Sequence, residues 1–142
     1  MTVQDDRLIY LVFTAQQRLR THLKKRFRDE GLRITAAQAA LLFLLRGNNG
    51  QTMSELSQAL LVDNSTLTGM IDRLEKMGFA ARGAHPSDRR AYRIEITPAG
   101  HEEADRAKRV LRDVNKAIKA EFSDEDVACF RKILKAFFHK FS

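Results

Sequence analysis

Tryptophan is absent from this sequence of 142 residues, proline occurs twice and cysteine once. The single cysteine, Cys129, excludes an internal disulfide, which agrees with a reducing compartment such as the cytoplasm. No apolar run approaches the roughly 18 residues of a membrane span. The first residues, with Asp5 and Asp6, lack the basic-then-apolar order of a signal peptide. We therefore expect a cytoplasmic protein that does not interact with a membrane.

The sequence also lacks the residue groupings on which enzymes and metal sites depend. It has no glycine-rich phosphate loop and no serine, cysteine or histidine group with nucleophile spacing. The run from His101 to Asp105 begins like a zinc-protease motif, but Asp105 occupies the place of the second histidine. We therefore expect no enzyme activity, no cofactor and no metal ion. Burial in a core or an interface is the expected role of Cys129, with redox sensing as the alternative.

The charged residues favour a polyanionic partner. The formal net charge is +7 and the isoelectric point is near 9.9, although many basic proteins bind no polyanion. The distribution is more informative, because residues 64–93 contain six cations against three acids. The six cations are Arg73, Lys76, Arg82, Arg89, Arg90 and Arg93. With 44% hydrophobic and 30% charged residues, the overall composition is that of one ordinary folded domain.

Two short helices joined by a tight turn are predicted in the middle of the chain. Thr52 and Glu55 have the spacing of a capping box, in which both side chains satisfy free backbone N–H groups at a helix start. The link at residues 61–63 is too short for anything but a turn into a second helix. Asp63 or Asn64 caps the second helix, and Gly78 ends it. The pattern is that of a helix-turn-helix.

The second of these helices has two different faces. Leu67, Met70, Ile71, Leu74 and Met77 recur at helical spacing and should face a core. The opposite stripe carries small hydroxyl residues at its start and cations further along: Ser65, Thr66, Thr68, Gly69, Arg73 and Lys76. Small residues let a helix enter the major groove, and phosphates can sit at a helix N-terminus. This stripe is therefore predicted to read DNA.

A hairpin follows, with strands predicted from Phe79 to Arg82 and from Tyr92 to Ile96. The second strand alternates Tyr92, Ile94 and Ile96 facing inward with charged residues facing outward. The loop between the strands is polar and basic, and a hairpin appended to a helix-turn-helix makes a wing. Arg89 and Arg90 are the candidates to reach an adjacent minor groove, where a narrow width concentrates negative potential.

The chain resembles the MarR family of bacterial regulators over nearly its whole length. The residues that carry the resemblance are Leu74 to Phe79, Arg82, Asp88 to Ala91 and Ile96 to Gly100, in the order and spacing of that family's signature. The resemblance implies that the helix matching Asn64 to Met77 is the recognition helix. It also implies that Arg90 enters the minor groove, held by Asp88, and that an amphipathic aromatic or phenolic effector binds between the dimerisation helices and the DNA-binding lobe.

Helices are also predicted on both sides of this central unit. A helix from about Asp6 to Glu30 has one apolar stripe (Leu8, Leu11, Val12, Ala15, Leu19, Leu23 and Phe27) and a basic face that we expect to be solvated, with contact to flanking phosphates as the alternative. Thr35 and Gln38 form a second capping-box pattern at the start of a buried helix.

Two more helices are expected after the wing. Thr97 and Pro98 start one that could run to Phe122, with Glu102 and Glu103 in its first turn to complement the helix dipole. Ser123 starts the last helix, whose apolar face is Val127, Phe130, Ile133, Leu134, Phe137, Phe138 and Phe141. Because so much exposed aromatic surface is an aggregation hazard, we expect it to be covered by the first helix, by a second subunit, or by both.

We therefore predict a mainly α protein with a small β-hairpin wing. Residues 34–97 should form a winged helix-turn-helix DNA-binding lobe, and residues 5–31 and 98–142 should form dimerisation helices. The predicted function is that of a sequence-specific transcriptional regulator, a homodimer on palindromic double-stranded DNA and a repressor released by a small ligand. The predicted DNA-contacting residues are Ser65, Thr66, Thr68, Gly69, Arg73, Lys76, Asp88, Arg89 and Arg90.

Two other functions agree with the same sequence. One is an architectural DNA-binding protein without an effector, which would show weak sequence preference. The other is a winged-helix protein-interaction module, against which Gly69 and the arginine pair of the wing argue. The operator, the regulated genes, the effector with its pocket residues, and the choice between repression and activation are left open by the sequence.

Overall fold

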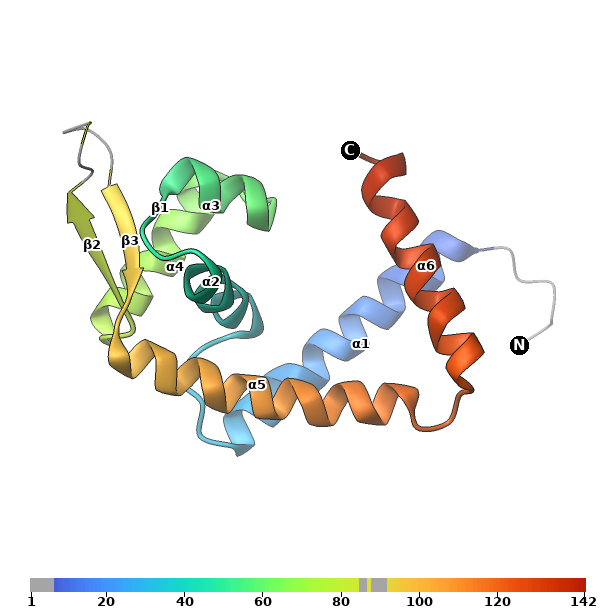
Figure 1. Ribbon diagram of the computed structural model, residues 1–142. Coiled ribbons are helices and arrows are strands. Elements are labelled where there is room, and N and C mark those ends of the chain that lie inside the picture. Colours follow the sequence, from blue (N-terminus) through green and yellow to red (C-terminus); the bar gives the residue numbers. More distant parts are fainter. Residues whose placement is uncertain (1–6, 85–86, 88–91) are drawn as a thin grey trace. The chain divides into compact units, whose positions relative to one another are not determined.

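A computed structural model describes residues 7–84, 87 and 92–142, and it confirms the predicted mainly α fold with a hairpin (Figure 1). In chain order the elements are α1 (Leu8–Asp29), α2 (Ala36–Gly47), β1 (Gln51–Thr52), α3 (Met53–Leu60), α4 (Asn64–Lys76), β2 (Ala80–Ala84), β3 (Tyr92–Ile96), α5 (Pro98–Lys119) and α6 (Asp124–Lys140). The chain divides into two compact units, residues 1–110 and 111–142, with the boundary inside α5.

Helix starts follow the local signals in the sequence. Thr35 and Gln38 make the complete capping box, in which Thr35 Oγ1 accepts from the Gln38 N–H at 3.1 Å and Gln38 Oε1 accepts from the Thr35 N–H at 2.9 Å. At the starts of three other helices one side chain accepts from a free backbone N–H: Thr52 on α3, Asp63 on α4 and Ser123 on α6. After α4, Gly78 has φ +79°, the left-handed conformation that glycine adopts without a steric penalty. These boundaries confirm the predictions with one exception. The capping box predicted at Thr52 and Glu55 is half formed, because Thr52 accepts from the Glu55 N–H while the Glu55 side chain makes no return bond among the described residues.

The three strands form one antiparallel sheet in the order β1-β3-β2. In the hairpin Ala80 pairs with Ile96 and Ala84 pairs with Tyr92. The strand β1 was not predicted, because two residues acquire strand geometry here only through their pairing with β3. The inward orientation predicted for Tyr92 is wrong: Ile94 and Ile96 are buried, whereas Tyr92 is 55% exposed. It lies at the end of the ladder, next to the loop, opposite the exposed Ala84.

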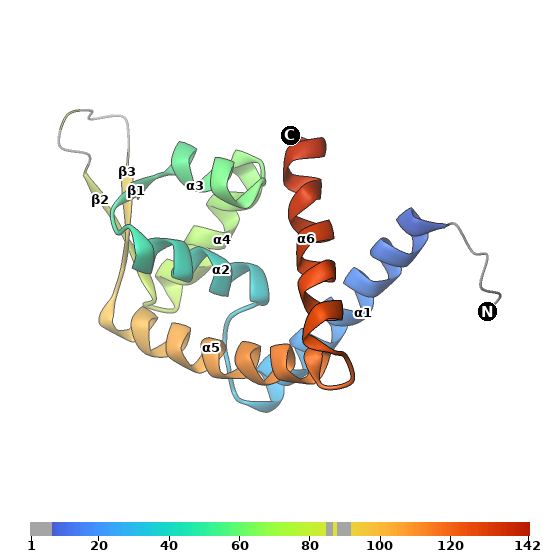
Figure 2. The same ribbon diagram turned by 45° about the vertical axis from the view of Figure 1, so that its right-hand side comes forward.

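The core of the first unit lies between the sheet and the helices α2, α3 and α4. Figure 2 shows these three helices to the right of the strands, and Figure 1 shows the end of α4 passing behind the hairpin. Its largest fully buried side chains are Leu41, Leu42, Leu45, Leu56, Leu67, Ile71, Leu74 and Ile94. The stripe predicted to face the core from α4 is therefore buried, except that Met77, after the last turn of the helix, is half-buried.

The start of α5 is fastened to the segment that follows α4. Thr97 Oγ1 donates to the Gly78 carbonyl at 2.6 Å and accepts from the Gly100 N–H at 3.0 Å. The Thr97 N–H donates to the Phe79 carbonyl at 3.1 Å. Gly100 lies so close to this carbonyl that a Cβ atom there would overlap the Phe79 backbone. The wing strands and α5 are thus joined through backbone contacts.

The role predicted for Glu102 and Glu103 is wrong, because the first turn of α5 contains no acid. Glu103 lies one turn further along and is buried, with 4% of its surface exposed. Its carboxylate accepts from the Arg33 N–H at 2.8 Å and from Arg106 Nη1 at 3.1 Å. It therefore holds the link between α1 and α2 against α5 instead of complementing a dipole.

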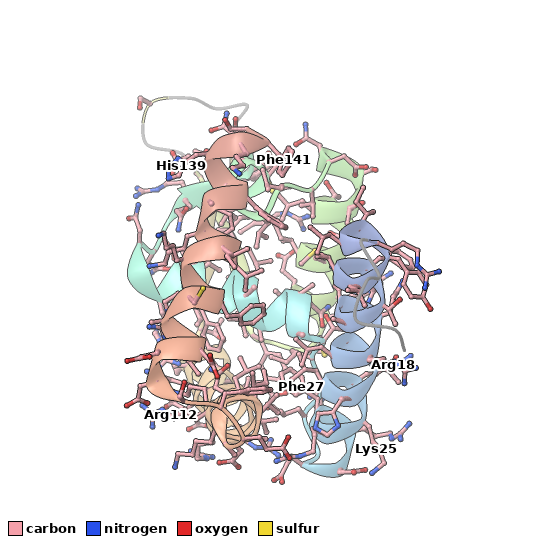
Figure 3. All side chains as sticks on the ribbon, turned by 90° about the vertical axis from the view of Figure 1, so that its right-hand side faces the viewer. Arg18, Lys25, Phe27, Arg112, His139 and Phe141 are labelled. Atoms are coloured by element: carbon pink, nitrogen blue, oxygen red, sulfur yellow. The ribbon has the colours of Figure 1, made fainter. Side chains whose placement is uncertain are left out.

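Both terminal helices present apolar side chains to solvent in the single chain. On α1 only the end of the predicted stripe is covered, since Phe27 is buried and Leu8, Leu11 and Leu19 are exposed. Figure 3 shows Phe27 pointing inward and Arg18 and Lys25 pointing outward, as expected for a solvated basic face. None of the described helices combines the length and the apolar composition needed to cross a membrane.

The helix α6 buries no residue in the single chain. Its exposed apolar side chains include Phe130, Ile133, Leu134, Phe138 and Phe141. His139 and Phe141 point to opposite sides at the end of α6 (Figure 3), and Arg131, Lys132 and Lys135 share the surface with His139. Cys129 is exposed as well, so its expected burial in a core of the single chain is wrong, and burial in an interface stays a prediction.

Candidate DNA-binding site

The outward face of α4 is accessible along its whole length. Ser65, Thr66, Thr68, Arg73 and Lys76 are exposed, and Gly69 is half-buried. A Cβ atom at Gly69 would have nothing within 4 Å, so the space in front of this position is open. The structure therefore brings six of the predicted residues together on one face. The other three, Asp88, Arg89 and Arg90, lie outside the described residues.

Hydrogen bonds within α4 determine what its first turn can offer to a ligand. Asp63 Oδ1 accepts from the Thr66 N–H at 2.7 Å and from Ser65 Oγ at 2.9 Å. Thr68 Oγ1 donates to the Asn64 carbonyl at 2.7 Å. Because the hydroxyl protons of Ser65 and Thr68 are used in these bonds, the two hydroxyl oxygens can act toward a ligand only as acceptors. Acceptors of this kind match the amino groups that adenine and cytosine present in the major groove.

The same bonds alter the expectation for the N-terminus of α4. The Thr66 N–H, followed by the hydroxyl groups of Thr66 and Ser65, holds the pKa of the Asp63 carboxyl below its ordinary value. Asp63 is therefore ionised at neutral pH and occupies the place that a phosphate would take at a helix N-terminus. Phosphate contacts must come from other parts of the site, such as the exposed Arg73 and Lys76.

Arg82 ties the hairpin to α4, a role that the sequence did not reveal. Arg82 Nη2 donates to Asp72 at 2.7 Å, and Nη1 bonds to Glu75. The hydrogen bond to Asp72 is the main reason that the pKa of Arg82 is raised, so the Arg82 guanidinium stays charged beside the two acids. The contact joins β2 to α4 and places a cation against two acids beside the outward stripe of α4. Arg82 follows Glu75 by seven residues and Asp72 by ten, and neither spacing predicts a contact across a helix-to-strand turn.

Arg93 is likewise engaged with the protein. Its Nε donates to the Gly50 carbonyl at 3.0 Å, which fixes β3 to the loop that precedes β1. Two of the six cations that were counted toward DNA binding thus have structural partners. In the described part of this segment, Arg73 and Lys76 are the cations that remain exposed on α4.

A second feature lies between α2 and α5 within the first unit. Phe43, Arg46 and Lys108 line a cavity of about 340 Å³. Arg46 Nη2 pairs with Asp105 and lowers the pKa of that carboxyl. Arg46 Nη1 is buried and has no hydrogen-bond partner in the described part of the chain. A buried guanidinium N–H without an acceptor is costly, and an anionic or polar ligand would satisfy it.

The chain matches the model of the MarR family over residues 34–92. The multiple antibiotic resistance protein MarR of Salmonella typhimurium is 31% identical over 130 residues, which cover 91% of this chain and 87% of that protein. An uncharacterised HTH-type transcriptional regulator of Bacillus subtilis, YsmB, is 33% identical over 111 residues, 75% of this chain and 73% of that protein.

Solved structures agree with these matches. A mutant of Escherichia coli MarR complexed with operator DNA superposes with a TM-score of 0.83 at 28% identity and covers 91% of each chain. In this chain the architecture is a helix-turn-helix with an open face on its second helix and a hairpin fastened to that helix by Arg82. With the family model, the relatives and the architecture in agreement, the chain belongs to the MarR family of transcriptional regulators.

Proposed function

We propose that the chain regulates transcription by binding palindromic double-stranded DNA as a homodimer, with one copy of α4 in the major groove of each half-site. The observation that carries the proposal is the outward face of α4, where small side chains and open space at Gly69 are followed by exposed cations. The E. coli relative bound to operator DNA supports it. We further propose that the protein acts in the cytoplasm, as a repressor and without catalysis.

The wing extends the same proposal. Asp88, Arg89 and Arg90 would follow β2 into the adjacent minor groove, a role that rests on the resemblance of the sequence to the family. The ion pairs of Arg82 with Asp72 and Glu75 support this, because they hold the base of the hairpin against α4. Specificity would come from the base edges that α4 meets, and the wing would add affinity and register.

Dimerisation is proposed from the exposed apolar faces of α1 and α6. Phe138 and Phe141 are 70% and 78% exposed, more than a monomer in water would be expected to leave uncovered at neighbouring positions of one helix. Pairing of these faces about a two-fold axis would hide them and would place two copies of α4 about 34 Å apart, one turn of DNA. A palindromic operator follows from this symmetry.

A leucine at Gly69 tests the orientation of α4. Gly69→Leu should lower affinity for an operator selected from a random DNA pool by about tenfold to a hundredfold, because its side chain fills the open space in front of the helix. Stability should hold or rise by about 1 kcal/mol, since leucine favours helix more than glycine does. Fluorescence anisotropy with labelled operator and thermal unfolding provide the two measurements.

Gly69→Ala is the matched control, because it gives the same gain in helix propensity with little bulk. It should bind nearly as well as the wild type. If Gly69→Leu kept both its affinity and its sequence preference, α4 would not enter the groove by this face. If the wild type selected no preferred sequence from the pool, the architectural alternative would replace the regulator.

We propose that the cavity at Phe43, Arg46 and Lys108 receives the effector, a small aromatic molecule with a carboxylate or phenolate group. The ring would lie against Phe43, and the anion would pair with Lys108 and with the Arg46 guanidinium, whose Nη1 would turn out of its buried position to donate. The cavity lies between a helix of the DNA-binding lobe and α5, so a ligand could alter how the two helices pack.

Benzoate, with the neutral benzamide for comparison, is a suitable probe. The concentration of benzoate that releases operator DNA should rise about tenfold in Arg46→Lys, which keeps the charge but loses the planar, forked set of donors. Arg112→Lys, an exposed substitution of the same kind elsewhere on α5, should respond like the wild type. Equal response to benzoate and benzamide, or an unchanged Arg46→Lys, would remove the effector from this cavity.

A further inference from the structure

Leu61, in the turn of the helix-turn-helix, has an unusual backbone conformation and an unusual exposure. Its φ and ψ are 55° and 43°, and among the described residues it is the one non-glycine residue with positive φ. The left-handed conformation is sterically unfavourable for a leucine, and the position after a helix is usually taken by glycine or asparagine. Its side chain is also 90% exposed.

The turn itself does not require a leucine. The Leu61 N–H and the Val62 N–H both donate to the Ser57 carbonyl, so the backbone path is held by main-chain bonds that glycine or asparagine would also make. The neighbouring Leu60 and Val62 are half-buried and contribute to packing, whereas Leu61 points into solvent. An apolar side chain thus bears a conformational cost, and the described part of the chain offers almost no burial to offset it.

Its position relative to α4 indicates what could offset that cost. Leu61 precedes the cap residue Asp63 by two positions, so the two Cα atoms lie within roughly 7 Å of each other. The exposed acceptors of Ser65 and Thr68 follow in the first turns of α4. A side chain at this distance can reach one or two base pairs beyond those met by the first turn of α4. The one apolar group on the major-groove edges of the bases is the C5-methyl group of thymine.

We propose that Leu61 is a specificity-determining residue that packs against a thymine methyl group at the edge of each half-site. The proposal rests on the proposed binding of DNA through α4. It adds an apolar contact to a face that otherwise offers hydroxyl acceptors and cations. Burial against the methyl group offsets the strain of the turn in the complex, and free protein retains that strain.

The test combines a change in the protein with removal of a methyl group from the DNA. Each thymidine of the selected operator is replaced in turn by deoxyuridine, which lacks only the methyl group. One symmetric replacement should weaken binding of the wild type about fourfold per methyl group buried. Leu61→Asn should bind the original operator more weakly by at least that factor and should be insensitive to the same replacement. Leu61→Met, which stays apolar, should keep the sensitivity.

Thermal unfolding of the DNA-free variants gives a second measurement, in which Leu61→Asn should gain stability although it loses affinity for DNA. Leu61→Asn should raise the thermal midpoint by about 3 °C, because asparagine tolerates the left-handed conformation. A gain in stability together with a loss of affinity separates a DNA contact from damage to the fold. Loss of affinity in Leu61→Asn that was equal on thymine and uracil operators would overturn the proposal, as would unchanged affinity. Failure of the wild type to select any operator would instead overturn the proposed function.

Discussion

Removal of residues 127–142 is expected to yield a monomer whose affinity for the palindromic operator is about 10²-fold to 10⁴-fold lower than that of the full chain. The deletion removes the apolar face of α6, with Phe130, Phe138 and Phe141 exposed in the single chain. When two copies of α4 are joined, the second half-site is bound at a high effective concentration, and a monomer loses that advantage. Sedimentation velocity and operator titration at equal salt measure the two effects.

A point variant of the full-length chain checks that the deletion acts through the interface. Phe138→Lys places a charge on the same face without shortening the helix, and it should weaken both dimerisation and operator binding. Affinity for a DNA carrying one half-site should change little in either variant. A deleted chain that sedimented as a dimer and bound the palindrome with full affinity would show that α6 is not the dimer interface.

The largest loss of stability is expected for Gly100→Ala, at about 3 kcal/mol. The new Cβ would overlap the carbonyl of Phe79 and press on Ile96 Cγ1, and backbone atoms cannot move aside as a flexible side chain can. Relief requires α5 to separate from the end of α4 and from the hairpin, which would also disturb the Thr97 hydrogen bonds. Urea unfolding followed by circular dichroism measures the difference.

Gly47→Ala is the control for this substitution. Gly47 also lies in a helix, but a Cβ there would meet nothing within 4 Å. Alanine should therefore stabilise the protein by up to about 1 kcal/mol through helix propensity alone. If Gly100→Ala were as stable as the wild type, the close packing of α5 on Phe79 would not exist in solution.

Local interactions explain why much of the fold could be predicted. Caps such as Thr35 and Asp63 act within three residues, and the stripes of α4 follow from helical periodicity, so both are visible in the sequence. Features that depend on distant partners were missed. The strand β1 exists through its pairing with β3, and Glu103 is engaged by Arg33, 70 residues earlier. The prediction that Tyr92 is buried was wrong, because the alternation of apolar and charged residues along a strand does not show where the core ends.

The candidate site divides in the same way. The residues on the outward face of α4 were predicted, because a helix places them together whatever surrounds it. The sequence did not predict which of these hydroxyl groups can still donate a hydrogen bond, because Ser65 and Thr68 already donate to Asp63 and to the Asn64 carbonyl. The partners of Arg82 and the unsatisfied nitrogen of Arg46 arise from tertiary packing, which the sequence does not show. From the sequence alone, Arg82 was counted among the cations that favour DNA binding.

The link through Arg82 has a consequence for the kind of DNA that the protein can accept. With β2 tied to Asp72 and Glu75 on α4, the base of the hairpin cannot swing independently of the helix. In the proposed complex, α4 and the hairpin are therefore held at a fixed spacing from each other. A duplex whose groove widths do not match that spacing must bend or twist to fit, and the free energy of this deformation depends on the DNA sequence. Base pairs that no side chain touches would then contribute to operator choice.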